Sequence, residues 1–216
     1  MQADCNQQKT ERTFWYTLVR ILAAVLLPVL YPFKFHNKER VTNRQAPYIL
    51  LSNHSSMLDP VFLACPIKRY EIRFLGKREL GKNKVFAYFL RKLHMISVSR
   101  HQMDMAAMRA CNEVLRNGQV LGIFPEGTRR PADQLMEGTE SGVSLIALRN
   151  KVPVMPVYIH GKFRLFRRTH IYFLPELDYS DLLPLGMGKD VCDELTRRIV
   201  QTMYDARNHA KQQLGA

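Results

Sequence analysis

The sequence Tyr48-Ile49-Leu50-Leu51-Ser52-Asn53-His54-Ser55-Ser56-Met57-Leu58-Asp59 joins a short apolar run to a histidine and, five residues later, an aspartate. A second segment has the same design, because Val120-Leu121-Gly122-Ile123 leads directly into Phe124-Pro125-Glu126-Gly127-Thr128-Arg129. Uninterrupted apolar runs of this length are typical of strands buried in a parallel sheet. Ligands bind beyond the carboxyl ends of such strands, so we expect the two segments to share one crevice.

Other apolar runs extend this pattern into an α/β fold. We predict strands at 48–51, 72–75, 95–98, 120–124, 152–159 and 171–174, and helices at 103–116, 141–149 and 189–211. In the first helix Met105, Met108, Cys111 or Asn112, and Leu115 fall near one face, and Asn117-Gly118 is typical of a C-cap. Strands that alternate with helices predict a mostly parallel, mixed central sheet flanked by helices.

The composition limits the class of protein. The chain has 216 residues, 46% of them apolar, which allows one sizeable core. Its formal net charge of +13 predicts an anionic partner. The candidates are nucleic acid, a membrane surface and a phosphorylated substrate, and the charge alone does not decide among them. The four cysteines are widely spaced and form no C-x-x-C pair, which favours reduced, buried thiols and gives no support to a zinc site.

The N-terminal region is the most apolar part of the chain. Residues 14–33 are interrupted only by Arg20 and Pro28, and after Arg20 thirteen uncharged residues remain, short of the ~20 that a spanning helix needs. Aromatic residues at both ends and the following Lys34, Lys38 and Arg40 are typical of a segment that lies in the membrane interface. We therefore expect a monotopic, membrane-associated helical anchor at 1–40 and a catalytic domain at 41–216, with an ordinary buried helix as the alternative for the anchor.

The pair His54 and Asp59 has two interpretations. An imidazole is well suited to take a proton near neutral pH, and a carboxylate can fix its tautomer and orientation if the chain turns between them. Alternatively, Asp59-Pro60 is a typical helix start, which would make Asp59 a cap and His54 a loop residue. Ser55 and Ser56 sit on the same turn, which is unfavourable for a catalytic triad, so we expect direct attack by a substrate hydroxyl.

Four blocks, in order, carry a resemblance to a known family. They are Asn53 to Asp59, Ile96-Ser97-Val98-Ser99-Arg100, Phe124 to Arg129, and Val152-Pro153-Val154-Met155-Pro156-Val157. Together they resemble the glycerolipid acyltransferases, most closely the 1-acylglycerol-3-phosphate acyltransferases of bacterial type, over about residues 45 to 160. The sequence departs from the family's usual pattern at His94, where glycine is common, and at Thr139-Glu140, where a phenylalanine-lysine pair is common.

The resemblance implies a role for each matching residue. His54 would be the general base and Asp59 the group that orients it. The substrate-binding positions would be Glu126, Gly127, Thr128, Arg129, Arg100 and Lys77, with Arg129 and Arg100 on the phosphate, and Pro156 would belong to a block that shapes the pocket. The acyl group would come from acyl-CoA or acyl carrier protein as co-substrate, and neither a metal nor another cofactor would be required.

The expected function is therefore acyl transfer to the sn-2 hydroxyl of lysophosphatidic acid, which gives phosphatidic acid. We expect membrane lipids as partners, no nucleic acid, and a location on the cytoplasmic face of the cell membrane. The two departures keep open a related acyltransferase that acts on another lysolipid or lyso-amino-lipid. An alternative of a different class is a basic nucleic-acid-binding protein, but the sequence has no recognition motif of that kind.

Overall fold

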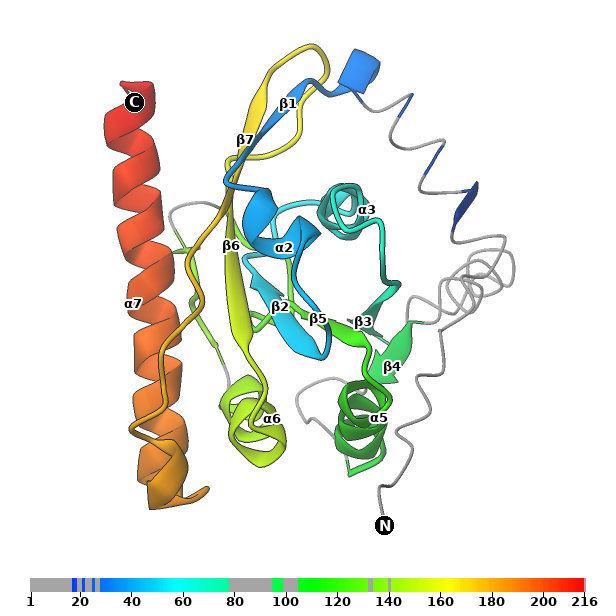
Figure 1. The fold of residues 1–216 in the computed structure, drawn as a ribbon. Coiled ribbons are helices and arrows are strands. Elements are labelled where there is room, and N and C mark those ends of the chain that lie inside the picture. The colour runs from blue at the N-terminus through cyan, green and yellow to red at the C-terminus, as the bar shows by residue number, and fades with distance from the viewer. Residues whose placement is uncertain are drawn as a thin grey trace.

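The structure, a computed structural model, describes residues 17–18, 21, 25, 28–77, 95–98, 105–131, 134–139 and 141–215. Within this part the core is a seven-stranded sheet in the order β1-β7-β6-β2-β5-β3-β4 (Figure 1). The strands are β1 (Phe33–His36), β2 (Tyr48–Ser52), β3 (Ile72–Lys77), β4 (Ile96–Val98), β5 (Val120–Ile123), β6 (Val154–His160) and β7 (Thr169–Phe173). The helices are α2 (Glu39–Thr42), α3 (Asp59–Ala64), α5 (Met105–Arg116), α6 (Gly142–Asn150), the 3-10 turn η3 (Leu183–Leu185) and α7 (Lys189–Leu214).

The strand directions place the ends of several strands along one edge. The neighbouring strands β6, β2, β5, β3 and β4 are parallel, whereas β7 runs antiparallel to β6 and β1 lies parallel to β7. The sheet is therefore mixed, as predicted. The carboxyl ends of β2 and β5 point the same way, so the segments that begin at Asn53 and at Phe124 leave the sheet side by side.

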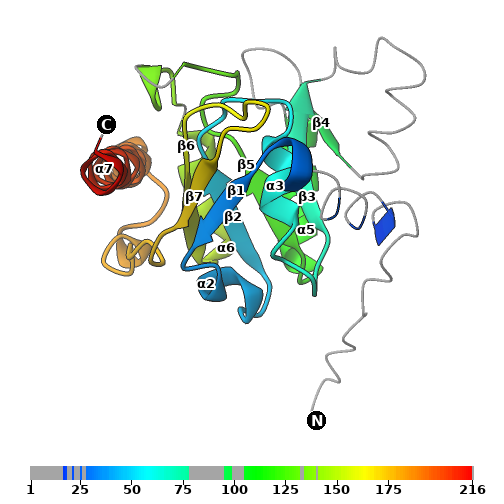
Figure 2. The same ribbon diagram turned by 90° about the horizontal axis from the view of Figure 1, so that it is seen from above.

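Helices cover both faces of the sheet (Figure 2). On one face α5, α6 and α7 pack over a core that contains Ile49 and Leu51 of β2. On the other face α2 and α3 pack over a core that contains Tyr48 and Leu50 of the same strand. Successive side chains of a strand point to opposite faces, so a strand between two helical layers needs apolar residues at every position. This explains the continuous apolar run at the start of the His54 segment.

All six predicted strands and all three predicted helices are present, with bounds that differ by a few residues. Gly118 adopts a positive φ of 67°, and its amide and that of Gln119 bond back to α5, which confirms the C-cap. Of the residues predicted to share one face of this helix, Met108, Cys111, Asn112 and Leu115 are buried, whereas Met105 is 69% exposed. The side chains of Cys65, Cys111 and Cys192 are buried, as predicted.

The sheet also includes a strand that the sequence did not predict. β1 pairs with β7 from Phe33↔Thr169 to His36↔Tyr172, so the sheet extends into the region assigned to the anchor. Most of residues 1–27 lie outside the described residues, so the anchor itself stays a prediction. Among the residues that are described, no helix is both long enough and apolar enough to cross a bilayer.

Candidate active site

His54 and Asp59 are in direct contact. His54 lies two residues beyond the end of β2, and Asp59 is the first residue of α3. The Nδ1 atom of His54 is 2.8 Å from Oδ2 of Asp59. The Asp59 side chain is fully buried, whereas that of His54 is 18% exposed. The turn between them therefore brings the carboxylate to Nδ1 of the imidazole and leaves the ring partly open to a ligand.

The Asp59 carboxylate faces the His54 turn rather than its own helix. Its Oδ2 atom accepts hydrogen bonds from the backbone amides of Ser55 at 2.7 Å and Ser56 at 2.8 Å. The N-cap of α3 is Leu58, and no side chain caps the helix there. The capping alternative for Asp59 is therefore wrong.

These contacts determine the tautomer of His54. Oδ2 of Asp59 receives two backbone N–H groups, so it acts as an acceptor, and the ring contact requires a hydrogen on Nδ1. A neutral imidazole with its hydrogen on Nδ1 has a lone pair on Nε2. The Ser55 hydroxyl instead faces Asp59, at 3.4 Å, and the Ser56 hydroxyl accepts from the Leu58 amide. The geometry thus suits His54 as a base for an external hydroxyl.

A stack of aromatic rings fixes the plane of the imidazole. Phe124, just past β5, stacks on His54 with ring centroids 4.2 Å apart, and Phe74 of β3 stacks on Phe124 at 5.7 Å. Phe74 lies opposite Gly122 in the sheet register. A Cβ atom at Gly122 would lie 2.4 Å from the Phe74 ring, so only glycine leaves room for it there. The two predicted segments therefore meet through side chains as well as through the sheet.

Glu126 ties the His54 turn to a second loop. Its side chain is buried, and its Oε2 accepts the backbone amide of His54 at 3.1 Å while Oε1 accepts that of Met136 at 2.8 Å. Burial raises the pKa of this carboxyl, and the amides of Met136 and His54 act in the opposite direction. In return, the His54 carbonyl accepts the amide of Arg130 at 2.8 Å. Both oxygens of Glu126 are engaged with the protein backbone, which supports a positioning role.

The other substrate-binding candidates lie in different surroundings. The chain turns after Glu126 at Gly127, which has a φ of 60°. Thr128 is partly buried, and Arg129 is exposed at the surface. Lys77 is the last residue of β3, and its side chain lies outside the described residues. Arg100 also lies outside them. The roles expected for these residues stay predictions.

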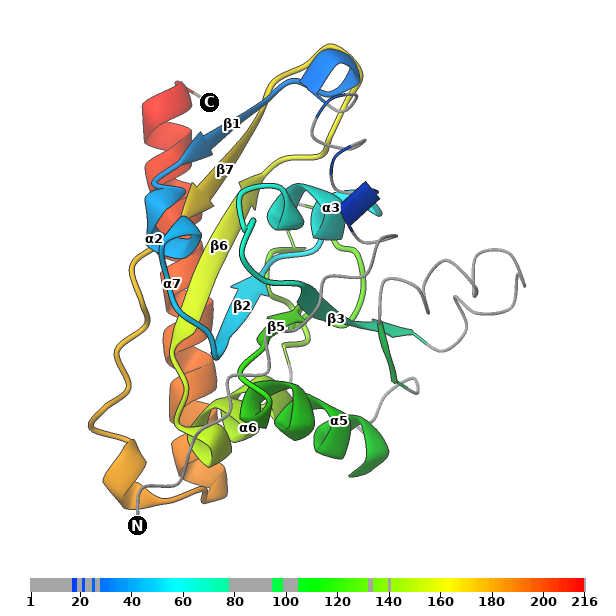
Figure 3. The same ribbon diagram turned by 45° about the vertical axis from the view of Figure 1, so that its right-hand side comes forward.

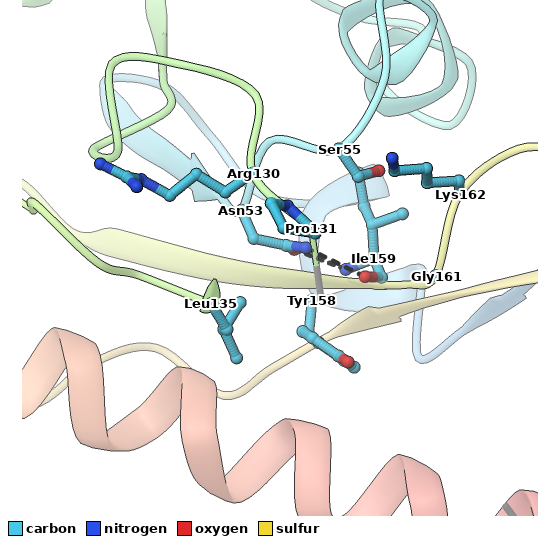
Figure 4. A pocket seen from close by; sticks show the side chains of 9 residues that line it. All are labelled: Asn53, Ser55, Arg130, Pro131, Leu135, Tyr158, Ile159, Gly161 and Lys162. Carbon is cyan, nitrogen blue, oxygen red and sulfur yellow. Dashed lines mark hydrogen bonds between the residues drawn. The ribbon is translucent and has the colours of Figure 1, made fainter. Parts of the chain in front are cut away.

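A pocket opens beside the His54 turn (Figure 4). Its lining residues are Asn53, Ser55, Arg130, Pro131, Leu135, Tyr158, Ile159, Gly161 and Lys162. The Asn53 side chain bonds to both the amide and the carbonyl of Ile159, at 2.8 and 3.0 Å, which fixes the turn against β6. Lys162 lies beside Ser55, whereas the guanidinium of Arg130 points away from them. The pocket therefore places an amino group close to the His54 turn.

The chain is similar to proteins of a known family. A family model described as Acyltransferase matches residues 32–160, which is more than half of the chain. The chain belongs to the acyltransferase family. The matched part runs from β1 to the end of β6 and contains His54, Asp59 and Glu126.

Individual relatives agree with the family. The acyltransferase is 29% identical over 187 residues to the 1-acyl-sn-glycerol-3-phosphate acyltransferase of Streptococcus pneumoniae, covering 82% of this chain and 69% of that protein. It is 30% identical over 137 residues to the protein of the same name from Bacillus subtilis, and the match covers 63% of this chain and 67% of that protein. The fold resembles the crystal structure of the 1-acyl-sn-glycerophosphate acyltransferase from Thermotoga maritima, with a TM-score of 0.67 and 22% sequence identity. The match covers 91% of this chain and 79% of that chain.

Both cationic residues of the pocket, Arg130 and Lys162, were not assigned to the site from the sequence. Arg130 follows Arg129 directly, and only the structure separates the exposed cation from the one that lines the pocket. Lys162 lies over a hundred residues from His54 in the chain and reaches it because β6 pairs with β2. The doubled arginine was the available signal for the first, and the basic run that begins at Lys162 was the signal for the second.

The contacts of Glu126 predict the effect of an amide at this position. In the acyltransferase with Glu126→Gln, one oxygen becomes an N–H₂ group that cannot accept from a backbone amide. We expect kcat to fall by about 10²-fold because the His54 turn shifts, and stability to fall by about 1–3 kcal/mol because a buried amide loses its acceptor. Steady-state kinetics and thermal unfolding in the same detergent measure the two effects.

The control is Glu113→Gln, which removes the same charge from an exposed residue of α5. We expect this variant to keep the kcat and unfolding temperature of the wild type. A Glu126→Gln enzyme that kept its kcat and only lost affinity for the acceptor would instead support direct contact of Glu126 with substrate.

Proposed function

We propose that this acyltransferase moves an acyl group from a thioester to the sn-2 hydroxyl of 1-acyl-sn-glycerol-3-phosphate, which gives phosphatidic acid. The observation that carries the proposal is the contact between His54 and Asp59, which leaves Nε2 of a partly exposed imidazole as an acceptor. The relatives named above supply the acceptor, because their names specify 1-acyl-sn-glycerol-3-phosphate.

The proposed reaction is a direct transfer. Nε2 of His54 takes the proton of the acceptor hydroxyl as its oxygen attacks the thioester carbonyl, and Asp59 stabilises the imidazolium that forms. The tetrahedral intermediate collapses by breaking the carbon–sulfur bond, and the thiol leaves with the proton that His54 held. Thioesters are activated acyl donors, so a base that is correctly positioned suffices and no acyl-enzyme intermediate is needed.

The donor and the location are part of the same proposal. The donor is acyl-CoA or acyl carrier protein, and no metal takes part in the step described. The acceptor is a lipid, so the enzyme works at a bilayer, and we propose the cytoplasmic face, where both donors are found. The excess of basic residues supports this placement, because anionic leaflets attract each basic residue near the surface by about 1 kcal/mol.

Arg129 is proposed to bind the phosphate of the acceptor. It is exposed on the turn that follows Glu126, and a guanidinium can bind a phosphate with two parallel hydrogen bonds. We expect Arg129→Ala to raise KM for 1-acyl-sn-glycerol-3-phosphate by about tenfold, which corresponds to the loss of one exposed charged contact, with a smaller change in kcat. Initial rates over a range of acceptor mole fractions in mixed micelles measure both constants.

Arg149→Ala is a matched control for this measurement, because Arg149 is an exposed arginine near the end of α6, which precedes β6 and so lies away from the His54 turn. It removes the same charge without touching the proposed site, and KM is expected to stay unchanged. Equal increases in KM for both variants would show that Arg129 acts only through the net charge.

The head group of the acceptor is tested by a panel of lysolipids. Acyl-CoA and acyl carrier protein are offered separately, with 1-acyl-sn-glycerol-3-phosphate, lysophosphatidylcholine, lysophosphatidylethanolamine or a lyso-amino-lipid as acceptor. We expect phosphatidic acid to be the main product. Faster transfer to an acceptor without a phosphate monoester would keep the chemistry of His54 and reject the proposed substrate.

A further inference from the structure

Exposed apolar side chains gather at one end of the molecule, on the loop between β6 and β7 and on the segment before β1. Phe166 is 74% exposed, Leu165 55% and Val29 68%, and Leu30 adjoins them. The exposed arginines Arg164, Arg167 and Arg168 flank these residues. We call these seven residues the loop surface.

The loop surface is continuous, although its parts lie far apart in the sequence. The amide of Phe166 donates to the carbonyl of Leu30 at 2.9 Å, and the amide of Thr169 donates to that of Pro32 at 2.9 Å. Figures 1 and 3 show the loop and residues 28–30 together at the same end of the molecule. The apolar residues of both segments therefore form one patch.

The loop has a defined shape that presents the apolar side chains outward. Arg164 and Arg167 form an isolated antiparallel bridge, closed by a hydrogen bond of 3.1 Å from the Arg167 amide to the Arg164 carbonyl. Phe166 lies at the tip of this turn and has a φ of 58°, a backbone conformation that is unfavourable for bulky residues. A tight turn with two large exposed apolar residues at its tip is costly in water, which indicates that something apolar covers it.

The charges that the two segments of the patch carry are all of one sign. Neither residues 21–38 nor residues 161–173 contain an aspartate or glutamate, while the second range holds Lys162 in addition to the three arginines. An apolar tip ringed by cations is complementary to an anionic bilayer, in which the tip enters the acyl region and the cations bind headgroups. A second copy of the chain fits poorly, because two such surfaces would bring six arginines together.

We propose that the loop surface binds an anionic lipid bilayer, and that its β6–β7 loop adds a contact beyond the predicted N-terminal anchor, to which Val29 and Leu30 belong. The proposal deepens the proposed function and rests on it, because a lysophospholipid acceptor must enter the site from the bilayer. It adds a second attachment to the membrane, and two attachments fix the orientation of an enzyme where one does not.

The loop surface is joined to the candidate active site. Phe163 stacks on Phe62 with ring centroids 3.8 Å apart and an angle of 8° between the rings, and Phe62 lies three residues after Asp59 on α3. Lys162, at the start of the same loop, lines the pocket beside the His54 turn. The bilayer contact would therefore hold the pocket at the level of the headgroups, where the acceptor phosphate lies.

The experiment places a fluorescent reporter on the loop. The chain has one tryptophan, so the full-length variant Trp15→Phe/Phe166→Trp carries a single reporter at the tip. With vesicles of phosphatidylglycerol and phosphatidylcholine we expect a blue shift of its emission and quenching by brominated acyl chains. The control Trp15→Phe/Met187→Trp reports from an exposed position beyond η3, at the other end of the molecule, and we expect neither change.

The arginines are tested by adding Arg164→Gln/Arg167→Gln/Arg168→Gln to the Trp15→Phe/Phe166→Trp protein. Each charge near an anionic surface contributes roughly fivefold in affinity, so the lipid concentration at half-maximal shift should rise at least tenfold on anionic vesicles and little on neutral ones. Emission from the loop reporter that vesicles leave unchanged would overturn the proposal. So would a blue shift without lipid that grows with protein concentration, since it would assign the surface to a second copy.

Acyl transfer in detergent micelles is measured on the same variants. Full transfer with no lipid contact at the loop reporter rejects the bilayer contact alone, whereas lipid contact with no transfer to any lysolipid rejects the proposed reaction alone.

Discussion

Replacing His54 with alanine is expected to lower kcat for acyl transfer by about 10³-fold, within the range that general bases contribute. Asp59 holds the imidazole with its hydrogen on Nδ1, so the lone pair on Nε2 is the group that takes the hydroxyl proton. Alanine removes that group and leaves the acceptor and donor contacts in place. The measurement is kcat with saturating thioester and acceptor in mixed micelles, where we expect KM to change much less than kcat.

His209→Ala is the control for this variant, since His209 is an exposed histidine on α7, on the other side of the sheet from α3. We expect it to match the wild type. A His54→Ala enzyme with wild-type kcat would show that the proton goes elsewhere, and Asp59 would then have only a structural role.

Asp59→Asn is expected to lower kcat by a comparable factor, about 10³-fold, while the fold stays intact. The amide oxygen of asparagine can still accept from the backbone of Ser55 and Ser56, but the charge that stabilises the imidazolium is lost. Because asparagine has nearly the same size, the fully buried site is not opened. Steady-state kinetics measure the loss, and thermal unfolding shows whether the structure has survived.

Asp59→Ala separates the two roles of this residue. It removes the charge and also leaves the amides of Ser55 and Ser56 without their acceptor, at about 1–3 kcal/mol for each buried group. We expect a lower unfolding temperature than for Asp59→Asn and an equal or greater loss of kcat. An Asp59→Asn enzyme with full activity would contradict the electrostatic role, whatever the stability of the alanine variant.

The sequence was sufficient to locate the strands that carry the site because these strands are buried on both faces. Residues 48–51 and 120–123 contain no charged residue, and such runs are recognisable without knowledge of their partners. β1 could not be located in this way. It has four residues, one of them exposed, and is held by its pairing with β7, more than 130 residues away. That stabilisation comes from tertiary contacts, which local sequence does not encode.

The candidate site likewise contains contacts that the sequence could indicate and contacts that only the fold reveals. The spacing of His54 and Asp59 allowed their contact, because a short turn can close over five residues, but it left open the alternative that Asp59 caps a helix. The backbone contacts of Glu126 were not predictable, since amides exist at every position and only the fold brings those of His54 and Met136 to one carboxylate. The exposure of Met105 was also not predictable, because helical spacing defines a face but not where the covering layer ends.

The most direct test of the account is the product formed from labelled acyl-CoA, or labelled acyl carrier protein, and 1-acyl-sn-glycerol-3-phosphate in mixed micelles. Wild type and His54→Ala run side by side, and the lipids are identified by mass. We predict labelled phosphatidic acid from the wild type, at a rate about 10³-fold above that of the variant. Equal rates, or no phosphatidic acid from the wild type with either donor, would contradict the account.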